Sequence, residues 1–169
     1  MMLRGLVALL LLALGTWSAA QTRGESEKSI EQGPLENRVK TLASIQPGLG
    51  AVMHEMAYRF TNIYWAANGG NWGLAQYQLK ELLEAQEVGE ITRPQHASML
   101  KANEQTYLAP LAQAIEKQDI QQFNHRFSAA VNGCNACHTA LGYGFIQFKL
   151  SKLPKQEFLD FSIKTSPKH

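Results

Sequence analysis

The chain has 169 residues, of which 45% are hydrophobic and 18% charged, with a formal net charge of +2 and two cysteines. This length and composition are typical of one folded domain with additional segments. They exclude a largely disordered chain, which needs low hydrophobicity and high net charge. The two cysteines exclude a disulfide-rich scaffold, and the near-neutral charge gives no support for a nucleic-acid partner.

The first 20 residues have the three-part layout of a secretory signal peptide. Arg4 supplies a positive charge, residues 5–15 form a short apolar run, and the Ser-Ala-Ala sequence at residues 18–20 offers a cleavage site. A membrane anchor is the alternative, but the apolar run is shorter than the ~20 residues that a spanning helix needs. We therefore expect export, a periplasmic location and no membrane span after cleavage.

A polar leader at residues 21–46 precedes the first long helical pattern. We expect this leader to be flexible, with a short candidate helix at residues 35–44. After Pro47, apolar side chains recur every three or four residues, as on one face of an amphipathic helix, until turn residues at 68–70 end the pattern. The apolar face comprises Leu49, Met53, Met56, Phe60, Ile63 and Tyr64.

Three further helices are predicted before residue 144. Asn71 can cap the first of them, which fades near Gly89. Pro94 suits the first turn of the next helix, and Pro110 should bend it, since proline removes a backbone hydrogen bond. Asp119 can cap the last helix, whose apolar face comprises Phe123, Phe127, Ala130, Val131, Cys134 and Leu141.

Four helices of this length with short connections predict an all-α fold, an antiparallel four-helix bundle over residues 47–144. The sequence has no internal repeat, no glycine-rich phosphate loop and no alternation of strand and helix patterns. Residues 145–169 then form a C-terminal tail, which alternates enough at residues 145–150 to be extended. We expect this tail to pack on the bundle.

Residues 134–138 read Cys-Asn-Ala-Cys-His, the C-x-x-C-H sequence by which c-type haem is attached. On a helix these positions share one side, because a turn takes ~3.6 residues. Two thiols can then bond the two vinyl-derived carbons at one edge of a porphyrin, while the adjacent imidazole reaches the iron. The motif therefore predicts Cys134 and Cys137 as covalent anchors and His138 as the proximal iron ligand.

Three other roles are open to this motif. A structural zinc site needs four ligands, and the chain has no second Cys pair. A thioredoxin-like pair needs a neighbouring strand–helix–strand pattern, which is missing. A local disulfide is the third alternative. Export favours haem, because c-type haem is attached outside the bacterial cytoplasmic membrane.

A four-helix bundle with C-x-x-C-H on its last helix resembles the class II c-type cytochromes, cytochrome c prime and its low-spin relatives. The resemblance covers residues 49–141 and implies a haem c inside the bundle with its proximal His on the last helix. In low-spin members a Met early in the first helix is the sixth ligand. The chain departs from this family in its longer leader and in the 31 residues that follow His138.

The resemblance implies that a sixth iron ligand would come from the first predicted helix. Met53 and Met56 lie one turn apart on its apolar face, and a thioether ligand raises the reduction potential of haem iron. Met53 is preferred because it stands nearer the helix start, and Met56 is the alternative. The other interpretation is that both fill the core. His54 points about 100° away from Met53 and is expected at the surface.

Other side chains of the same helix are candidates for the surroundings of a haem. Phe60 and Tyr64 are candidate walls of a haem pocket, because aromatic rings can flank a porphyrin, and the alternative is ordinary core packing. Arg59 is a candidate partner for a haem propionate, since a guanidinium suits bidentate carboxylate binding. The alternative for Arg59 is a surface position.

The leading functional hypothesis is an exported c-type cytochrome that carries one electron and is not an enzyme. Haem iron changes its oxidation state by one electron, and a Met/His site changes its geometry little between the two states. If neither Met reaches the iron, the alternative is a five-coordinate haem protein that binds or senses a small gas such as NO or CO. A haem enzyme would need distal acid–base groups, for which His54 and Arg59 are the candidates.

A redox partner protein, still unidentified, is the expected partner of an electron carrier. The lysines of the tail can attract an acidic partner to the haem edge, or they form a solvated face. Class II relatives are often dimers, so the resemblance also admits a homodimer. The tail lysines are Lys149, Lys152, Lys155, Lys164 and Lys168.

Overall fold

The computed structural model describes residues 30–154 and 158–167, so the expected signal peptide and Lys155, Lys168 and His169 lie outside the described residues. The chain divides between Gln46 and Pro47 into two compact units. The described part of the first unit contains α2 (Leu35–Ser44), the short helix that the sequence predicts. Its apolar side chains, among them Leu35, Val39 and Leu42, are exposed.

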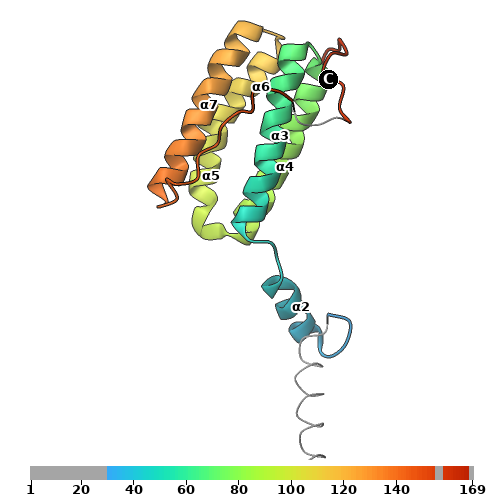
Figure 1. Cartoon of the computed structure of the whole chain (residues 1–169). Helices are drawn as coiled ribbons and strands as arrows, with labels where there is room; N and C mark the ends of the chain where they lie inside the picture. Colours follow the sequence, from blue (N-terminus) through green and yellow to red (C-terminus); the bar gives the residue numbers. More distant parts are fainter. Residues whose placement is uncertain (1–29, 155–157, 168–169) are drawn as a thin grey trace, which may run out of the picture. The chain divides into compact units, whose positions relative to one another are not determined.

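The second unit is helical and confirms the all-α prediction. Its helices lie side by side as a bundle, and the described residues contain no strand (Figure 1). Within residues 30–154 and 158–167, no helix combines the length and the apolar character needed to cross a bilayer. In chain order the elements are α3 (Leu49–Gly69), α4 (Trp72–Thr92), η1 (Pro94–His96), α5 (Ala97–Asn103), η2 (Glu104–Leu108), α6 (Ala109–Glu116) and α7 (Ile120–Ala140).

Capping side chains explain where α4 and α7 begin. The Oδ1 atom of Asn71 accepts a hydrogen bond from the backbone N–H of Leu74 at 3.2 Å. Asp119 Oδ1 accepts from the backbone N–H groups of Gln121 and Gln122. Both caps satisfy N–H groups that have no partner inside their own helix, and both confirm the predicted caps.

The sequence predicted that the second helix fades near Gly89, but the helix does not end there. The helix α4 continues to Thr92, and Gly89 is buried where α4 approaches the start of α3. A Cβ atom at residue 89 would lie 3.1 Å from Leu49 Cδ1 and 3.2 Å from Val52 Cγ1. Glycine therefore permits a close helix–helix contact here, and this contact outweighs its low helix propensity.

The disturbance expected at Pro110 takes the form of a π-helical turn. Pro110 stands at the start of α6, and the turn η2 (Glu104–Leu108) comes directly before α6. A proline ring would clash with the carbonyl of residue 106 in a regular helix and cannot donate to it, so a wider turn accommodates it. The consecutive helical segments α5, η2 and α6 therefore continue through Pro110 without a break.

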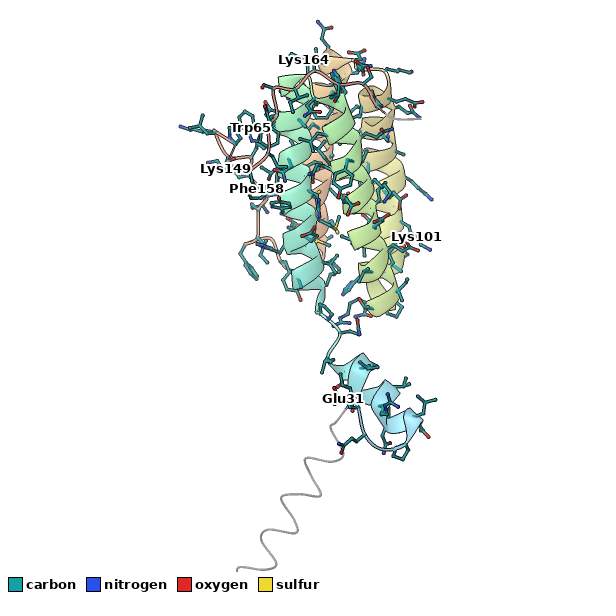
Figure 2. The ribbon with its side chains drawn as sticks, turned by 90° about the vertical axis from the view of Figure 1, so that its right-hand side faces the viewer. Glu31, Trp65, Lys101, Lys149, Phe158 and Lys164 are labelled. Carbon is teal, nitrogen blue, oxygen red and sulfur yellow. The ribbon has the colours of Figure 1, made fainter. Side chains whose placement is uncertain are left out.

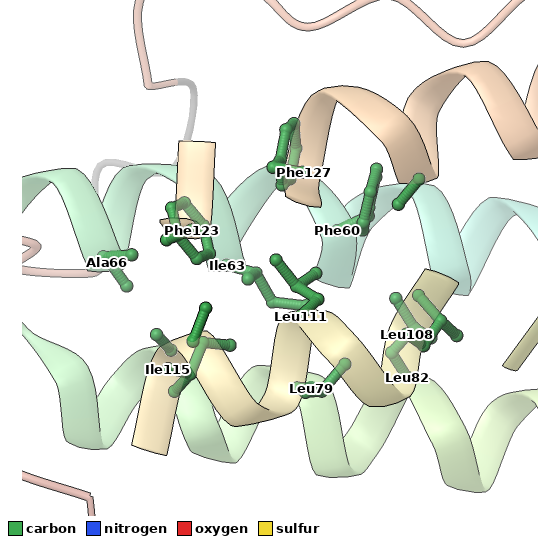
Figure 3. Packing of buried hydrophobic residues seen from close by; sticks show 14 of the residues in the cluster. Phe60, Ile63, Ala66, Leu79, Leu82, Leu108, Leu111, Ile115, Phe123 and Phe127 are labelled. Carbon is green, nitrogen blue, oxygen red and sulfur yellow. The ribbon is translucent and has the colours of Figure 1, made fainter. Parts of the chain in front are cut away.

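An aromatic cluster between α3 and α7 forms one side of the core. The rings of Phe60 and Phe127 are stacked with centroids 4.3 Å apart, and Tyr64 lies 5.0 Å from Phe127. Figure 3 shows Phe60, Phe127 and Leu111 pointing into the bundle from three different helices. Each buried aromatic ring removes a large apolar area from water, so this cluster is a main source of bundle stability.

The C-terminal tail packs on the bundle, and its contacts define its course. It leaves the end of α7 and extends to the turn between α3 and α4 (Figure 1). There Asn71 Nδ2 donates to the Asp160 carbonyl at 2.9 Å, and Thr165 Oγ1 donates to Asn71 Oδ1 at 2.6 Å. Figure 2 shows Lys164 at this end of the bundle, where its ammonium donates to the Gly69 carbonyl.

Asn71 therefore has two structural roles, and we expect Asn71→Ala to destabilise the protein more than a cap variant without tail contacts. Asp119→Ala is the matched control, since Asp119 is exposed and caps α7, and it should cost about 1 kcal/mol. Asn71→Ala should cost roughly 1–3 kcal/mol more, because its partners in the tail lose their hydrogen bonds. Urea unfolding of both variants measures the difference. Equal losses, with equal rates of proteolysis in the tail, would contradict the second role.

Candidate haem-attachment site

The C-x-x-C-H residues occupy the last two turns of α7. Cys134, Cys137 and His138 are each half-buried. Directly after the helix, Gly142 adopts a φ of 82°, a left-handed conformation that glycine accepts without strain and that reverses the chain. The Tyr143 N–H then donates to the His138 carbonyl at 2.7 Å, which closes the helix end. The tail therefore begins next to the motif.

The two thiols are unpaired and protonated. Burial, together with the neighbouring Cys137, raises the pKa of Cys134 to about 11, and burial also raises the pKa of Cys137. The Cys137 thiol is placed to donate to Met99 Sδ in α5 at 3.2 Å. Unpaired thiols on one side of a helix are free to form thioether bonds, which is the chemistry that haem attachment requires.

The imidazole of His138 is oriented by a backbone carbonyl. Its Nδ1 atom lies 2.9 Å from the carbonyl oxygen of Ile146. A carbonyl can only accept, so Nδ1 carries a proton, and in the neutral imidazole this leaves the lone pair on Nε2. Histidines that bind metals in proteins commonly have this arrangement, because the hydrogen bond selects the tautomer and directs the ring.

The tail is attached to the motif at a second point, through Asn135. The Phe148 N–H donates to Asn135 Oδ1 at 2.7 Å, and Asn135 Nδ2 donates back to the Phe148 carbonyl at 3.2 Å. The Phe148 ring lies edge-on to Phe60 of α3, with centroids 5.3 Å apart. We call residues 146–148 the strap, because this segment connects the motif on α7 with α3.

The candidate ligands and pocket residues of α3 lie on its core side. Met56 is buried, whereas Met53 is partly buried against the same core. Phe60 is buried and is linked to the motif through Phe148, whereas Tyr64 contacts Phe123 and Phe127, which lie nearer the start of α7. All four side chains thus contribute to the core between α3 and its neighbours.

Arg59 and His54, the other two candidates on α3, lie outside the apolar core. Arg59 Nε donates to Glu55 at 2.7 Å, and its Nη1 donates to Gln78 of α4 at 3.1 Å. Its guanidinium is thus engaged between α3 and α4 by groups of the protein itself, which weakens the case for a propionate partner. His54 is exposed, as the helical spacing predicted.

Tyr107 is a neighbour of the motif that the sequence did not reveal. It belongs to the π-helical turn η2, and its ring lies against Gly133, the buried residue directly before Cys134. A Cβ atom at residue 133 would overlap this ring. Met99 of α5 is a second such neighbour, since its sulfur contacts the Cys137 thiol. Both contacts join residues far apart in the chain, and no local pattern signals them.

We expect Gly133→Ala to displace the Tyr107 ring and to lower the free energy of unfolding by roughly 1–3 kcal/mol, the usual range for overpacking. Gly50→Ala is the matched control, because Gly50 lies in α3 with open space around its Cα, and alanine there should be neutral or slightly stabilising. Urea unfolding of both variants gives the comparison. A Gly133→Ala variant as stable as Gly50→Ala would contradict the close packing of Tyr107.

The raised pKa of Cys134 makes the stability of the haem-free protein depend on pH. Between the ordinary thiol pKa and about 11, the unfolded chain releases this proton and the folded chain keeps it. Stability is therefore lost as the pH rises through this range, by up to ~1.4 kcal/mol per pH unit. Unfolding of haem-free wild type and Cys134→Ala at pH 7 to 10 measures this. We expect the wild type to lose more stability than the variant, and parallel profiles would contradict the burial of the thiol.

A metal site built from several side chains is not found in the part of the chain that the structure describes, where no three His, Cys, Asp or Glu side chains converge. A haem iron differs from such a site, because its porphyrin supplies most of the ligands and the motif supplies one nitrogen. Comparisons with protein-family models, curated proteins and solved structures give no match to this chain. What the site can do is therefore inferred from the chemistry of its own side chains.

Proposed function

We propose that this protein is an exported c-type cytochrome of the class II kind, an antiparallel four-helix bundle that carries one electron through a covalently attached haem c. The observation that supports this most is the oriented His138 beside two unpaired thiols on α7. Its Nδ1 lies 2.9 Å from the Ile146 carbonyl, so its Nε2 is available to bind iron. A thioredoxin-like pair does not require this orientation. A structural zinc site would use it too, but such a site needs four ligands, and the chain has no second Cys pair.

Each side chain of the motif has a defined role in this proposal. The S–H groups of Cys134 and Cys137 would add across the two vinyl groups of the porphyrin, so that each sulfur bonds one carbon and each hydrogen goes to the other, and this addition needs no oxidant. His138 would hold the iron through Nε2. When bound, the haem supplies an iron that gains or loses one electron.

The position of α3 supports a sixth ligand from this helix. The start of α3 and the end of α7 lie at the same end of the bundle (Figure 1). Met53 and Met56, in the first turns of α3, are therefore on the side of the bundle where a haem attached to α7 would be held. Thioether ligation and an apolar environment raise the reduction potential and suit an electron carrier.

The test is a spectrum of the protein produced with its signal peptide in a host that attaches c-type haem. We expect haem to remain on the protein after denaturing electrophoresis, and the reduced spectrum to stay unchanged under carbon monoxide. A protein without covalent haem would overturn the proposal. A carbon monoxide adduct that forms readily would instead favour the five-coordinate gas-binding protein.

A further inference from the structure

We propose that Asn135 is a positioning residue, which holds the strap so that the Ile146 carbonyl stays on His138 and sets the reduction potential of the bound iron. This inference rests on the proposed function, because it concerns the ligand of a haem. Asn135 is one of the two variable positions of C-x-x-C-H, and the attachment chemistry itself makes no demand on it.

The contact between Asn135 and Phe148 fixes the backbone of one residue of the strap, because it holds the two successive peptide units on either side of the Phe148 Cα. One side-chain amide accepts from the Phe148 N–H at 2.7 Å and donates to the Phe148 carbonyl at 3.2 Å. Asn and Gln carry a donor and an acceptor in one plane, as this pairing requires, whereas aspartate carries acceptors alone. The amide thus replaces the neighbouring strand that an extended segment would pair with in a sheet.

The spacing of the contacts couples the Asn135 pairing to His138. The strap runs antiparallel to α7, since Ile146 meets His138 and Phe148 meets Asn135. From Ile146 to Phe148 the extended strap advances about 6.6 Å, and from Asn135 to His138 the helix rises about 4.5 Å. The spacing of the two contacts along the strap is therefore similar to their spacing along α7. The Phe148 ring against Phe60 adds a third point of attachment. With Phe148 held, Ile146 has little freedom to move away from the imidazole.

The carbonyl on Nδ1 has an electronic consequence at Nε2. Because the Ile146 carbonyl accepts a hydrogen bond from Nδ1–H, the imidazole becomes a stronger electron donor, and a stronger donor stabilises ferric over ferrous iron. Loss of the pairing frees the strap, so the Ile146 carbonyl can leave Nδ1, which weakens this donation. Removal of such outer partners of a metal ligand typically changes metal affinity by about 10–100-fold. We expect the ratio of ferric to ferrous protein to change by about tenfold.

The experiment compares haem-loaded wild type, Asn135→Ala and Asn132→Ala. Asn132 is an exposed asparagine on the same helix, so its variant controls for the loss of one amide. For Asn135→Ala we expect a higher reduction potential, with a tenfold fall in the ferric to ferrous ratio, equivalent to about 59 mV for one electron. Hydrogen exchange at the Phe148 amide should become at least tenfold faster. Both quantities should be unchanged in Asn132→Ala.

Asn135→Gln is the second variant, and it keeps both polar groups while moving them by one methylene. We expect it to fold and to shift the potential in the same direction as Asn135→Ala, but less. If the ferric to ferrous ratio of Asn135→Ala stays within twofold of the wild-type ratio, the positioning role is overturned while the cytochrome proposal stands. An unchanged exchange rate of the Phe148 amide would overturn it in the same way. A wild-type protein that carries no covalent haem would overturn both.

Discussion

Replacing Cys134 and Cys137 together by serine should leave no haem on the protein after extraction with acid acetone. These are the two cysteines of the chain, and a hydroxyl does not form the thioether bond. Without the thioethers, His138 holds the haem by coordination alone, and acid protonates that histidine. Serine is close to cysteine in size, and both positions are half-buried, so the fold should persist.

The measurement is the haem content of the variant before and after extraction, with a haem stain after denaturing electrophoresis. Single serine variants keep one thioether and should retain a covalent haem. Met99→Leu is the matched control, because it removes the sulfur that contacts Cys137 but neither attachment atom. Haem that stays on the double variant after extraction would contradict covalent attachment.

Replacing Met53 by leucine should convert a low-spin haem to a high-spin form that binds carbon monoxide. Leucine keeps the volume of methionine but offers no ligand atom, so the iron loses its sixth ligand at small cost to packing, below about 1.5 kcal/mol. Met56→Leu is the paired variant one turn later, at a more buried position of the same core. It should keep the low-spin spectrum.

Visible spectra of both variants, with and without carbon monoxide, decide between the two methionines. The opposite result, with high-spin iron in Met56→Leu, would assign the ligand to Met56. Unchanged spectra in both variants would remove these methionines from the coordination sphere. A high-spin wild type would already favour the five-coordinate alternative.

Local signals in the sequence were sufficient for most helix ends. Asn71 and Asp119 cap their helices because a short polar side chain satisfies N–H groups two or three residues away, a distance fixed by the sequence itself. The left-handed Gly70 ends α3 for the same kind of local reason. Gly89 shows the limit of this reasoning, because its place inside α4 depends on Leu49 and Val52, about 40 residues earlier.

The candidate site also has some features that the local sequence sets and others that depend on tertiary contacts. The sequence by itself determined that two thiols and an imidazole share one side of a helix, because 3.6 residues make a turn wherever that helix lies. Only the tertiary structure decided that Ile146 meets His138, that Phe148 pairs with Asn135, and that Met99 contacts Cys137. Such contacts depend on how the chain reverses after α7 and on the register of neighbouring helices. Both are set by packing of the whole core, which no short stretch of residues encodes.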